Sequence, residues 1–287
     1  TIVDSENTKL NGLKKFSIIL NTTEFNPEKY QSLAQILSHS YAASASPVQI
    51  LEPFLKVFLS GKADCGEHGK FNEESWDYRQ AYLASPLGDI IELFGAEDVV
   101  TLWSALLTKK RVLVYSSNVV ELLKIVRALP LLVFHRQNWD VLRPIVDLED
   151  KIAREELVTA ANYVCGVTDS NAEHNTELYD VFVDVSARKI KIADHASKSL
   201  APTQFHSSLA DTLSEAHEKS LEVEGPQADQ LLIKLLLSKT KALLAKLNSL
   251  SDEGEKLKPE DLNQPELLPL RRFLWDVAVA EAVASVE

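Results

Sequence analysis

The sequence predicts a mixed α/β protein with a mostly parallel sheet, and three patterns lead to this prediction. Residues 111–115 form a nearly continuous apolar run, which is typical of strands buried on both faces of a sheet. A helical segment and a second apolar run follow it, in the order of a strand–helix–strand unit with a parallel crossover. From about residue 202 onward, only helical patterns are found.

The N-terminal part is predicted to contain a short strand, two helices and a polar connection. Phe16–Leu20 is rich in residues that favour strands. Asn26 and Pro27 mark a helix start, because Asn caps free N–H groups and Pro fits the first helical turn. Val48–Leu59 carries apolar residues at helical spacing. Gly61–Glu74 is polar and holds three glycines, so it is predicted to be an exposed loop or linker.

The central part of the chain is predicted to supply the sheet and three of its helices. The helices are expected at Pro86–Phe94, Ala96–Lys109 and Val119–Leu129. The strands are expected at Arg111–Tyr115, Leu131–Phe134 and Asn162–Thr168, and in a hairpin of Tyr179–Val185 and Arg188–Ile192. The hairpin is indicated by strict alternation of lysine and isoleucine in its second arm, which turns one face toward the core and the other toward solvent.

The longest C-terminal helix is expected at about Gln227–Leu250, where leucines recur on one face and lysines on others. A leucine stripe of this kind is more often the buried face of a domain helix. The alternative is a seam that pairs with the coiled coil of a partner. The sequence leaves both interpretations open.

Composition argues against several classes of protein. The chain has 42 acidic and 30 basic residues, a net charge of −12, whereas nucleic-acid binders normally carry a basic surface. No apolar run reaches the roughly 18–20 residues that a membrane-spanning helix needs. The two cysteines cannot form a disulfide framework, so a reducing, cytoplasmic setting is expected.

Motifs that carry bond-making chemistry are not found. The sequence has no phosphate-binding or dinucleotide-binding glycine pattern and no serine nucleophile elbow. Cys65 and His68 are three residues apart, but no second pair follows at the spacing of a zinc site. Cys165 lies within an expected strand and is interpreted as a small buried side chain. We therefore expect no catalytic, cofactor-binding or metal-binding residues, and a binding or regulatory function.

Two polar clusters follow expected strands, where open α/β sheets bind their ligands. The first is formed around Asn118, after the central strand. The second is His135–Trp139, after the predicted strand Leu131–Phe134. The alternative for the second cluster is a strand-end loop with its tryptophan folded into the core. The candidate partner-contact residues are Asn118, His135, Arg136, Gln137 and Trp139.

Several segments resemble the DENN domain family, in the order found in that family. Lys109–Ser117 is similar to the central strand of DENN domains, and Val164–Val167 and Asp180–Val185 are similar to the next two strands. Four longer segments resemble the late-endosomal branch of the family: Phe25–Tyr30, Arg79–Ala84, His135–Trp139 and Leu178–Val183. The resemblance covers essentially the whole chain.

The resemblance implies a DENN-type fold in four regions. These are the end of a longin-like lobe (1–45), a helix and linker (46–75), the central α/β DENN lobe (76–200) and a helical downstream segment (201–287). The chain is expected to enter the longin-like lobe partway, because only the last strand and helix of that lobe are recognised.

The resemblance also implies two functions. DENN proteins typically act as guanine nucleotide exchange factors for Rab-type small GTPases, which they hold between their lobes; this needs a complementary surface and no positioned acid or base. The same branch is associated with late endosomes and with the Commander endosomal-recycling complex. The alternative is therefore a non-catalytic scaffold subunit that binds coiled-coil partners in Commander. In either case a cytoplasmic protein, peripheral to late endosomes and without a membrane span, is expected.

Overall fold

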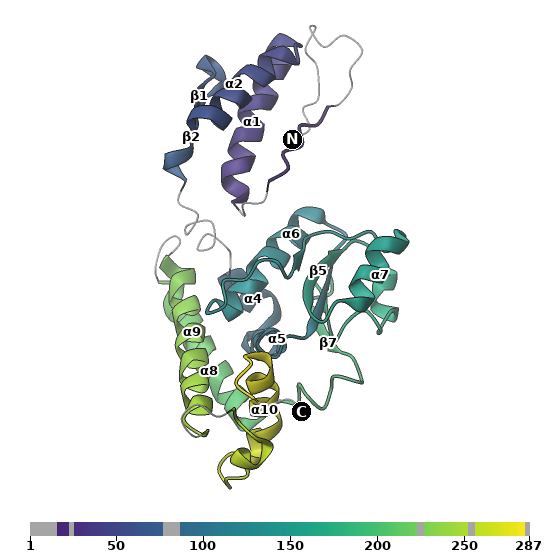
Figure 1. Ribbon diagram of the computed structural model, residues 1–287, viewed down its shortest axis with the longest axis vertical. Coiled ribbons are helices and arrows are strands. Elements are labelled where there is room, and N and C mark those ends of the chain that lie inside the picture. Colours follow the sequence, from purple (N-terminus) through teal and green to yellow (C-terminus); the bar gives the residue numbers. More distant parts are fainter. Residues whose placement is uncertain (1–15, 23–25, 77–86, 223–226, 252–255, 285–287) are drawn as a thin grey trace. The chain divides into compact units, whose positions relative to one another are not determined.

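A computed structural model describes residues 16–22, 26–76, 87–222, 227–251 and 256–284. The chain divides into two compact units, unit 1 with residues 1–83 and unit 2 with residues 84–287 (Figure 1). The segment Arg79–Ala84, which contributes to the resemblance, lies outside the described residues. The extent of the longin-like lobe stays a prediction.

Unit 1 consists of two helices and a hairpin. The elements are α1 (Pro27–Ser44), α2 (Val48–Ser60), β1 (Lys62–Asp64) and β2 (Lys70–Asn72). The Asn26 side chain accepts the backbone N–H of Lys29 at 3.3 Å, so the predicted helix cap is confirmed. Buried side chains of α1 and β2 form the core: Leu33, Ile36, Leu37 and Phe71.

Two predictions for unit 1 are wrong. Phe16–Leu20 is not a strand, although Ile18 and Leu20 do pack against the core. Gly61–Glu74 is not a loop but the β1–β2 hairpin with two 3-10 turns, Gly66–His68 and Glu73–Ser75. Its sequence resembles that of a loop because each short strand contributes a single buried apolar side chain. These are Ala63 and Phe71, which lie opposite each other.

Unit 2 contains the predicted sheet, which is mixed and mostly parallel, as expected of a DENN-type fold. The strands are β3 (Arg111–Tyr115), β4 (Leu142–Arg143), β5 (Tyr163–Val167), β6 (Val181–Asp184) and β7 (Lys189–Ile192). Their order is β4-β5-β3-β6-β7. The three pairings that involve β3 or β4 are parallel, and β7 is antiparallel to β6.

The predicted strand Leu131–Phe134 is wrong. Residues Leu129–Val133 form a fully buried 3-10 helix, η4, directly after α6 (Val119–Ala128). A short apolar run can be a buried helical segment as well as a strand, and periodicity does not distinguish them. Pro130 favours the helix, because it fits a first turn and cannot donate to a sheet. The chain from β3 therefore passes through α6 and η4 to β4, and β5, the parallel neighbour of β3, comes later in the sequence.

The remaining helices cover the sheet or pack on one another. They are α4 (Leu87–Phe94), α5 (Ala96–Leu107), α7 (Lys151–Thr159), α8 (Gln204–Ser220), α9 (Gln227–Asn248) and α10 (Arg271–Ala280), with 3-10 turns at Ser170–His174, Pro259–Leu262 and Leu268–Leu270. The helix α5 contacts both β3 and α8, and so connects the sheet to the C-terminal helices (Figure 1).

The leucine stripe of α9 is the buried face of a domain helix. Leu232, Leu236, Leu243 and Leu247 are all buried. On the same helix Thr240 is buried and accepts the indole N–H of Trp103 at 3.1 Å, which fixes α9 to α5. This decides between the two interpretations of the stripe, because a seam for a partner would be exposed.

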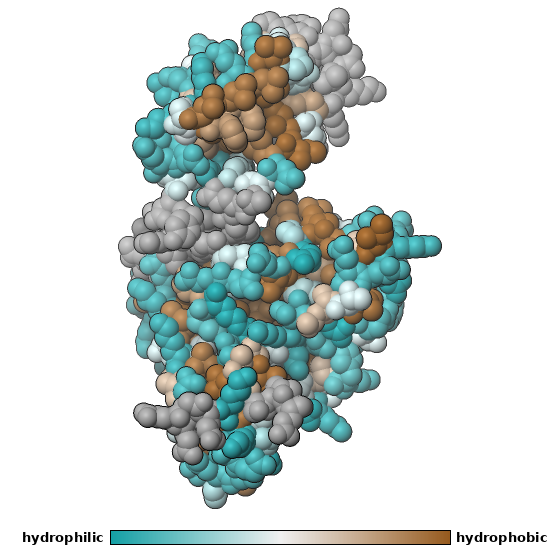
Figure 2. Space-filling model, in the orientation of Figure 1, coloured by the Kyte–Doolittle hydropathy of each residue, from teal (hydrophilic) through white to brown (hydrophobic). Residues whose placement is uncertain are grey.

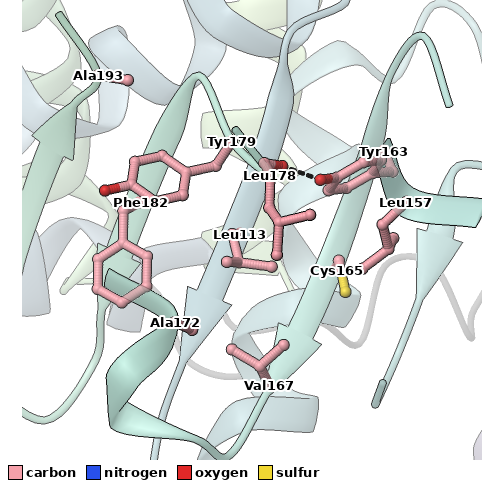
Figure 3. Close-up of a cluster of buried hydrophobic side chains, with 10 residues drawn as sticks. All are labelled: Leu113, Leu157, Tyr163, Cys165, Val167, Ala172, Leu178, Tyr179, Phe182 and Ala193. Atoms are coloured by element: carbon pink, nitrogen blue, oxygen red, sulfur yellow. Dashed lines mark hydrogen bonds between the residues drawn. The ribbon is translucent and has the colours of Figure 1, made fainter. Parts of the chain in front are cut away.

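One face of the sheet is covered by an aromatic core (Figure 3). Tyr179 and Phe182 lie with ring centroids 5.3 Å apart, and the hydroxyl of Tyr163 donates to the carbonyl of Leu178. Cys165 is fully buried in β5, and burial raises the pKa of its thiol to about 12. The interpretation of this cysteine as a buried core side chain is thus confirmed.

Gly166 of β5 is required by a close backbone contact. A Cβ atom at this position would lie 2.2 Å from the carbonyl oxygen of Pro144. The backbone N–H of Val146, two residues after Pro144, donates to the carbonyl of Gly166 at 2.8 Å. The segment after β4 is therefore held against β5 where no side chain intervenes.

We expect the substitution Gly166→Ala to lower the free energy of unfolding by about 1–3 kcal/mol, because the added methyl group must displace Pro144. Urea unfolding followed by circular dichroism measures this loss. The matched control is Gly88→Ala in α4, whose added Cβ makes only ordinary contacts of 3.5 Å or more. An unchanged midpoint for Gly166→Ala would show that the Pro144 segment moves freely.

Candidate functional site

Asn118 lies where the sequence predicts it, directly after β3 at the C-terminal edge of the sheet. Its side chain accepts the backbone N–H of Val120 at 3.0 Å and so caps α6. Its own N–H donates to the hydroxyl of Ser116, a buried residue, at 3.1 Å. Asn118 thus fixes the start of α6 while it remains exposed.

The first turns of α6 present an exposed apolar surface that the sequence analysis did not identify. Val120 is 76% exposed, and Val119 and Leu123 are 43% and 39% exposed. Ile145, 46% exposed, follows β4 at the same edge of the sheet, because β3, β5 and β4 are parallel. Figure 2 shows apolar surface over α6. We call Asn118, Val119, Val120, Leu123 and Ile145 the α6 surface.

A cavity of about 300 Å³ is shared by α4, α6 and the turn after β6. Apolar side chains from each of these elements line it: Leu93, Ile125 and Val185. Charges of both signs lie at its margin, including the ion pair of Lys124 with Asp89. An apolar floor with charged margins is typical of protein–protein interfaces.

The cluster at His135–Trp139 has a different place from the one predicted. Arg136 donates from Nη1 to the carbonyl of Leu106 at 2.7 Å and from Nη2 to that of Leu107 at 2.5 Å. These carbonyls belong to the last turn of α5, where carbonyl groups have no helical N–H four residues later. The carbonyl of Leu106 also accepts the backbone N–H of Lys109 at 3.1 Å. Nε of Arg136 donates to Oε1 of Glu281 at 2.8 Å, and Nε2 of His135 lies 3.0 Å from the same oxygen.

The environment of Glu281 keeps it charged. Burial of this carboxylate works against ionisation, but the hydrogen bond from His135 and the charge and hydrogen bond of Arg136 outweigh it, so the pKa of Glu281 is lowered. The three side chains are between 10% and 17% exposed. His135 and Arg136 therefore stabilise the fold from within unit 2.

The predicted contact residues are consequently not brought together. Asn118 lies at the C-terminal end of β3, whereas Arg136 contacts the end of α5, which leads into the N-terminal end of that strand. Gln137 is exposed, with a φ of +46°, and Trp139 is half-buried. The expectation that this cluster follows a strand fails because η4 is helical.

Unit 1 has an apolar surface of its own on α2. Five side chains of this helix are at least half exposed: Val48, Leu51, Leu55, Phe58 and Leu59. Figure 2 shows the corresponding apolar area on unit 1. The sequence could have indicated this exposed apolar surface, because a helix that is apolar on nearly every side cannot bury all of its faces in a small unit. We call these residues the α2 surface.

Within the described parts of the chain, no group of three or more His, Cys, Asp or Glu side chains is arranged to hold a metal ion. In the same residues no helix is both long and apolar enough to cross a membrane.

We expect Glu281→Gln to lower the free energy of unfolding at neutral pH by about 2–4 kcal/mol, because it leaves the largely buried guanidinium group of Arg136 without its counter-charge. The folded pKa of Glu281 is below its ordinary value of 4.5, so its stabilisation is complete above that value and is lost as the pH falls through the folded pKa. Urea unfolding from pH 7 down to values well below 4.5 should show that the difference in unfolding free energy between Glu281→Gln and the unmodified chain stays constant above 4.5 and narrows below it. The substitution Glu92→Gln, at an exposed residue, serves as control. A difference in unfolding free energy that does not change with pH would contradict the role given to the Glu281 carboxylate.

The chain is similar in sequence to several known proteins. A family model described as "Stabilization of polarity axis" (SPA) matches residues 86–194, which include β3 to β7. The DENN domain-containing protein 10 of Dictyostelium discoideum is 40% identical over 274 residues, covering 93% of this chain and 73% of that protein. The proteins of the same name from Danio rerio and Homo sapiens are 34% and 33% identical, covering all of this chain and 81% and 80% of their own lengths. The chain therefore belongs to the DENN domain-containing protein 10 family.

Proposed function

We propose that this chain regulates late endosomal traffic as a guanine nucleotide exchange factor for a Rab-type small GTPase. The observation that supports the proposal is the α6 surface, an exposed apolar area beside a cavity with charged margins. Soluble proteins rarely expose contiguous apolar areas unless these bind a partner. Membership in a DENN family favours a GTPase as that partner.

Exchange makes only modest chemical demands on the chain. The factor has to bind the GTPase more tightly when its nucleotide site is empty than when it is occupied, and the difference in affinity drives nucleotide release. Apolar contacts and paired charges supply that difference without an acid, a base or a metal ion. In this proposal Val120 and Leu123 bind the apolar part of the GTPase, and Asn118 keeps α6 in position.

We expect Val120→Asp to slow the release of fluorescent GDP from the responsive Rab protein at least about tenfold, because it places a charge in an apolar interface. The release assay uses a panel of purified Rab proteins, with the Dictyostelium discoideum relative tested in parallel. Stability should be unchanged, since Val120 is 76% exposed.

The matched control is Val158→Asp on α7, where an exposed valine lies outside the α6 surface. If both variants retain full activity, the exchange site lies elsewhere. If the unmodified chain accelerates no Rab protein while a known exchange factor does, the exchange proposal is wrong for that panel.

A second candidate function is supported by the α2 surface. Val48, Leu51, Leu55 and Phe58 follow one another at intervals of three, four and three residues. This is the spacing of the a and d positions through which helices pair in coiled coils. We propose as the alternative that the chain is a scaffold subunit that binds coiled-coil subunits of Commander through α2.

We expect the double substitution Leu55→Glu and Phe58→Glu to abolish capture of purified Commander coiled coils in a pull-down, with GDP release unaffected. Both side chains are at least half exposed, so unit 1 should remain folded. Val120→Asp is the reciprocal control, because it should leave the pull-down intact. Loss of both activities in either variant would mean that the two surfaces do not act separately.

A further inference from the structure

The cavity beside the α6 surface is lined by two opposite charges that do not pair with each other. Glu121 lines it from the first turn of α6, and Arg188 lines it from the turn between β6 and β7. Both residues are exposed, and within the described parts of the chain neither side chain makes an ion pair or a hydrogen bond. One carboxylate and one guanidinium group therefore stay unsatisfied at the same cavity.

The other two charges at this cavity are already satisfied. Lys124 of α6 forms an ion pair with Asp89 of α4. Each of these side chains neutralises the other, so neither offers a free charge to a ligand. The charges available to a bound partner are consequently those of Glu121 and Arg188, on two different elements that share one apolar floor.

The backbone of Arg188 adopts a conformation that is unfavourable for an arginine. Its φ is +53°, in the left-handed region that glycine adopts freely and residues with a Cβ atom do not. The turn is closed without the arginine side chain, because the Asp184 carboxylate accepts the N–H of Ala187 at 2.8 Å. Strained residues of this kind occur preferentially at functional sites. The strain thus favours a role for the guanidinium group in contacts outside the fold.

We propose that this cavity selects its partner by the order of charges along the bound segment. Arg188 binds a carboxylate of the partner, Glu121 binds a cationic side chain, and an apolar side chain between these two enters the cavity. The inference rests on the proposed function, because it assigns the segment to the GTPase that the α6 surface binds. Charges fixed on two walls reject a segment with the reversed order, so they contribute specificity more than affinity.

The test reverses the two charges separately and together. Arg188→Glu and Glu121→Lys each place like charges opposite each other, so each should slow GDP release from the responsive Rab protein at least about tenfold. The double variant keeps the net charge of the chain but reverses the order of charges, and it should be at least as slow as the single variants. Lys189→Glu is the matched control, because this exposed lysine does not line the cavity; it should change the rate less than about twofold.

Arg188→Gly separates recognition from folding. Glycine adopts the positive φ without strain, so the urea midpoint of unfolding should stay unchanged or rise. GDP release should nevertheless slow, although less than with Arg188→Glu, because no like charge is introduced. The effects of both variants should diminish with added salt, which screens exposed charges. A lowered midpoint for Arg188→Gly would assign the arginine to the fold and overturn the proposal.

The remaining outcomes distinguish this proposal from the exchange proposal. Full activity of the double variant would show that Glu121 and Arg188 pair with each other, and normal release by Arg188→Glu would show that no carboxylate is bound; either result overturns the charge order and leaves the exchange proposal intact. Binding to nucleotide-free Rab proteins is measured in parallel by biolayer interferometry. Binding that depends on Arg188 without faster GDP release would support the charge order and contradict exchange. If the chain binds no Rab protein of the panel, both proposals are wrong for that panel.

Discussion

The guanidinium group of Arg136 joins three parts of unit 2 that are distant in the sequence. It binds the last carbonyls of α5, it extends from the segment after η4, and it pairs with Glu281 beyond α10. Since α5 leads into β3, the position of the central strand depends on this contact. The geometry is favourable because a cation is placed at the negative end of a helix and meets a carboxylate at the same point.

The sequence predicts those elements whose signals are local. Asn26 and Asn118 cap the helices that they were expected to cap, and the apolar run of β3 forms the centre of the sheet. The helical nature of η4 was missed, because a fully apolar run of this length is compatible with two structures and neighbouring strands decide between them. The role of Arg136 was missed for a similar reason, since Glu281 follows it 145 residues later.

The candidate site likewise combines a residue with a local sequence signal and residues whose exposure depends on the rest of the fold. Asn118 was identified because strand ends are recognisable, but the exposure of Val120 is a property of the assembled unit, in which α6 buries Leu122, Ile125 and Val126 instead. The two ends of the sheet therefore differ in which side chains lie there. The N-terminal end is occupied by internal ion pairs, such as that of Arg111 with Asp180, and the C-terminal end leaves apolar side chains exposed.

The edges of the sheet also limit how the molecule can associate with copies of itself. At one edge β4 has two residues and is followed at once by Pro144, which has no N–H to offer to another strand. At the other edge β7 exposes Lys189 and Lys191, whose charges repel an approaching strand. A protein that displays two apolar helical surfaces is prone to aggregate, and the blocked edges of the five-stranded sheet remove one route by which such contacts would grow into fibrils.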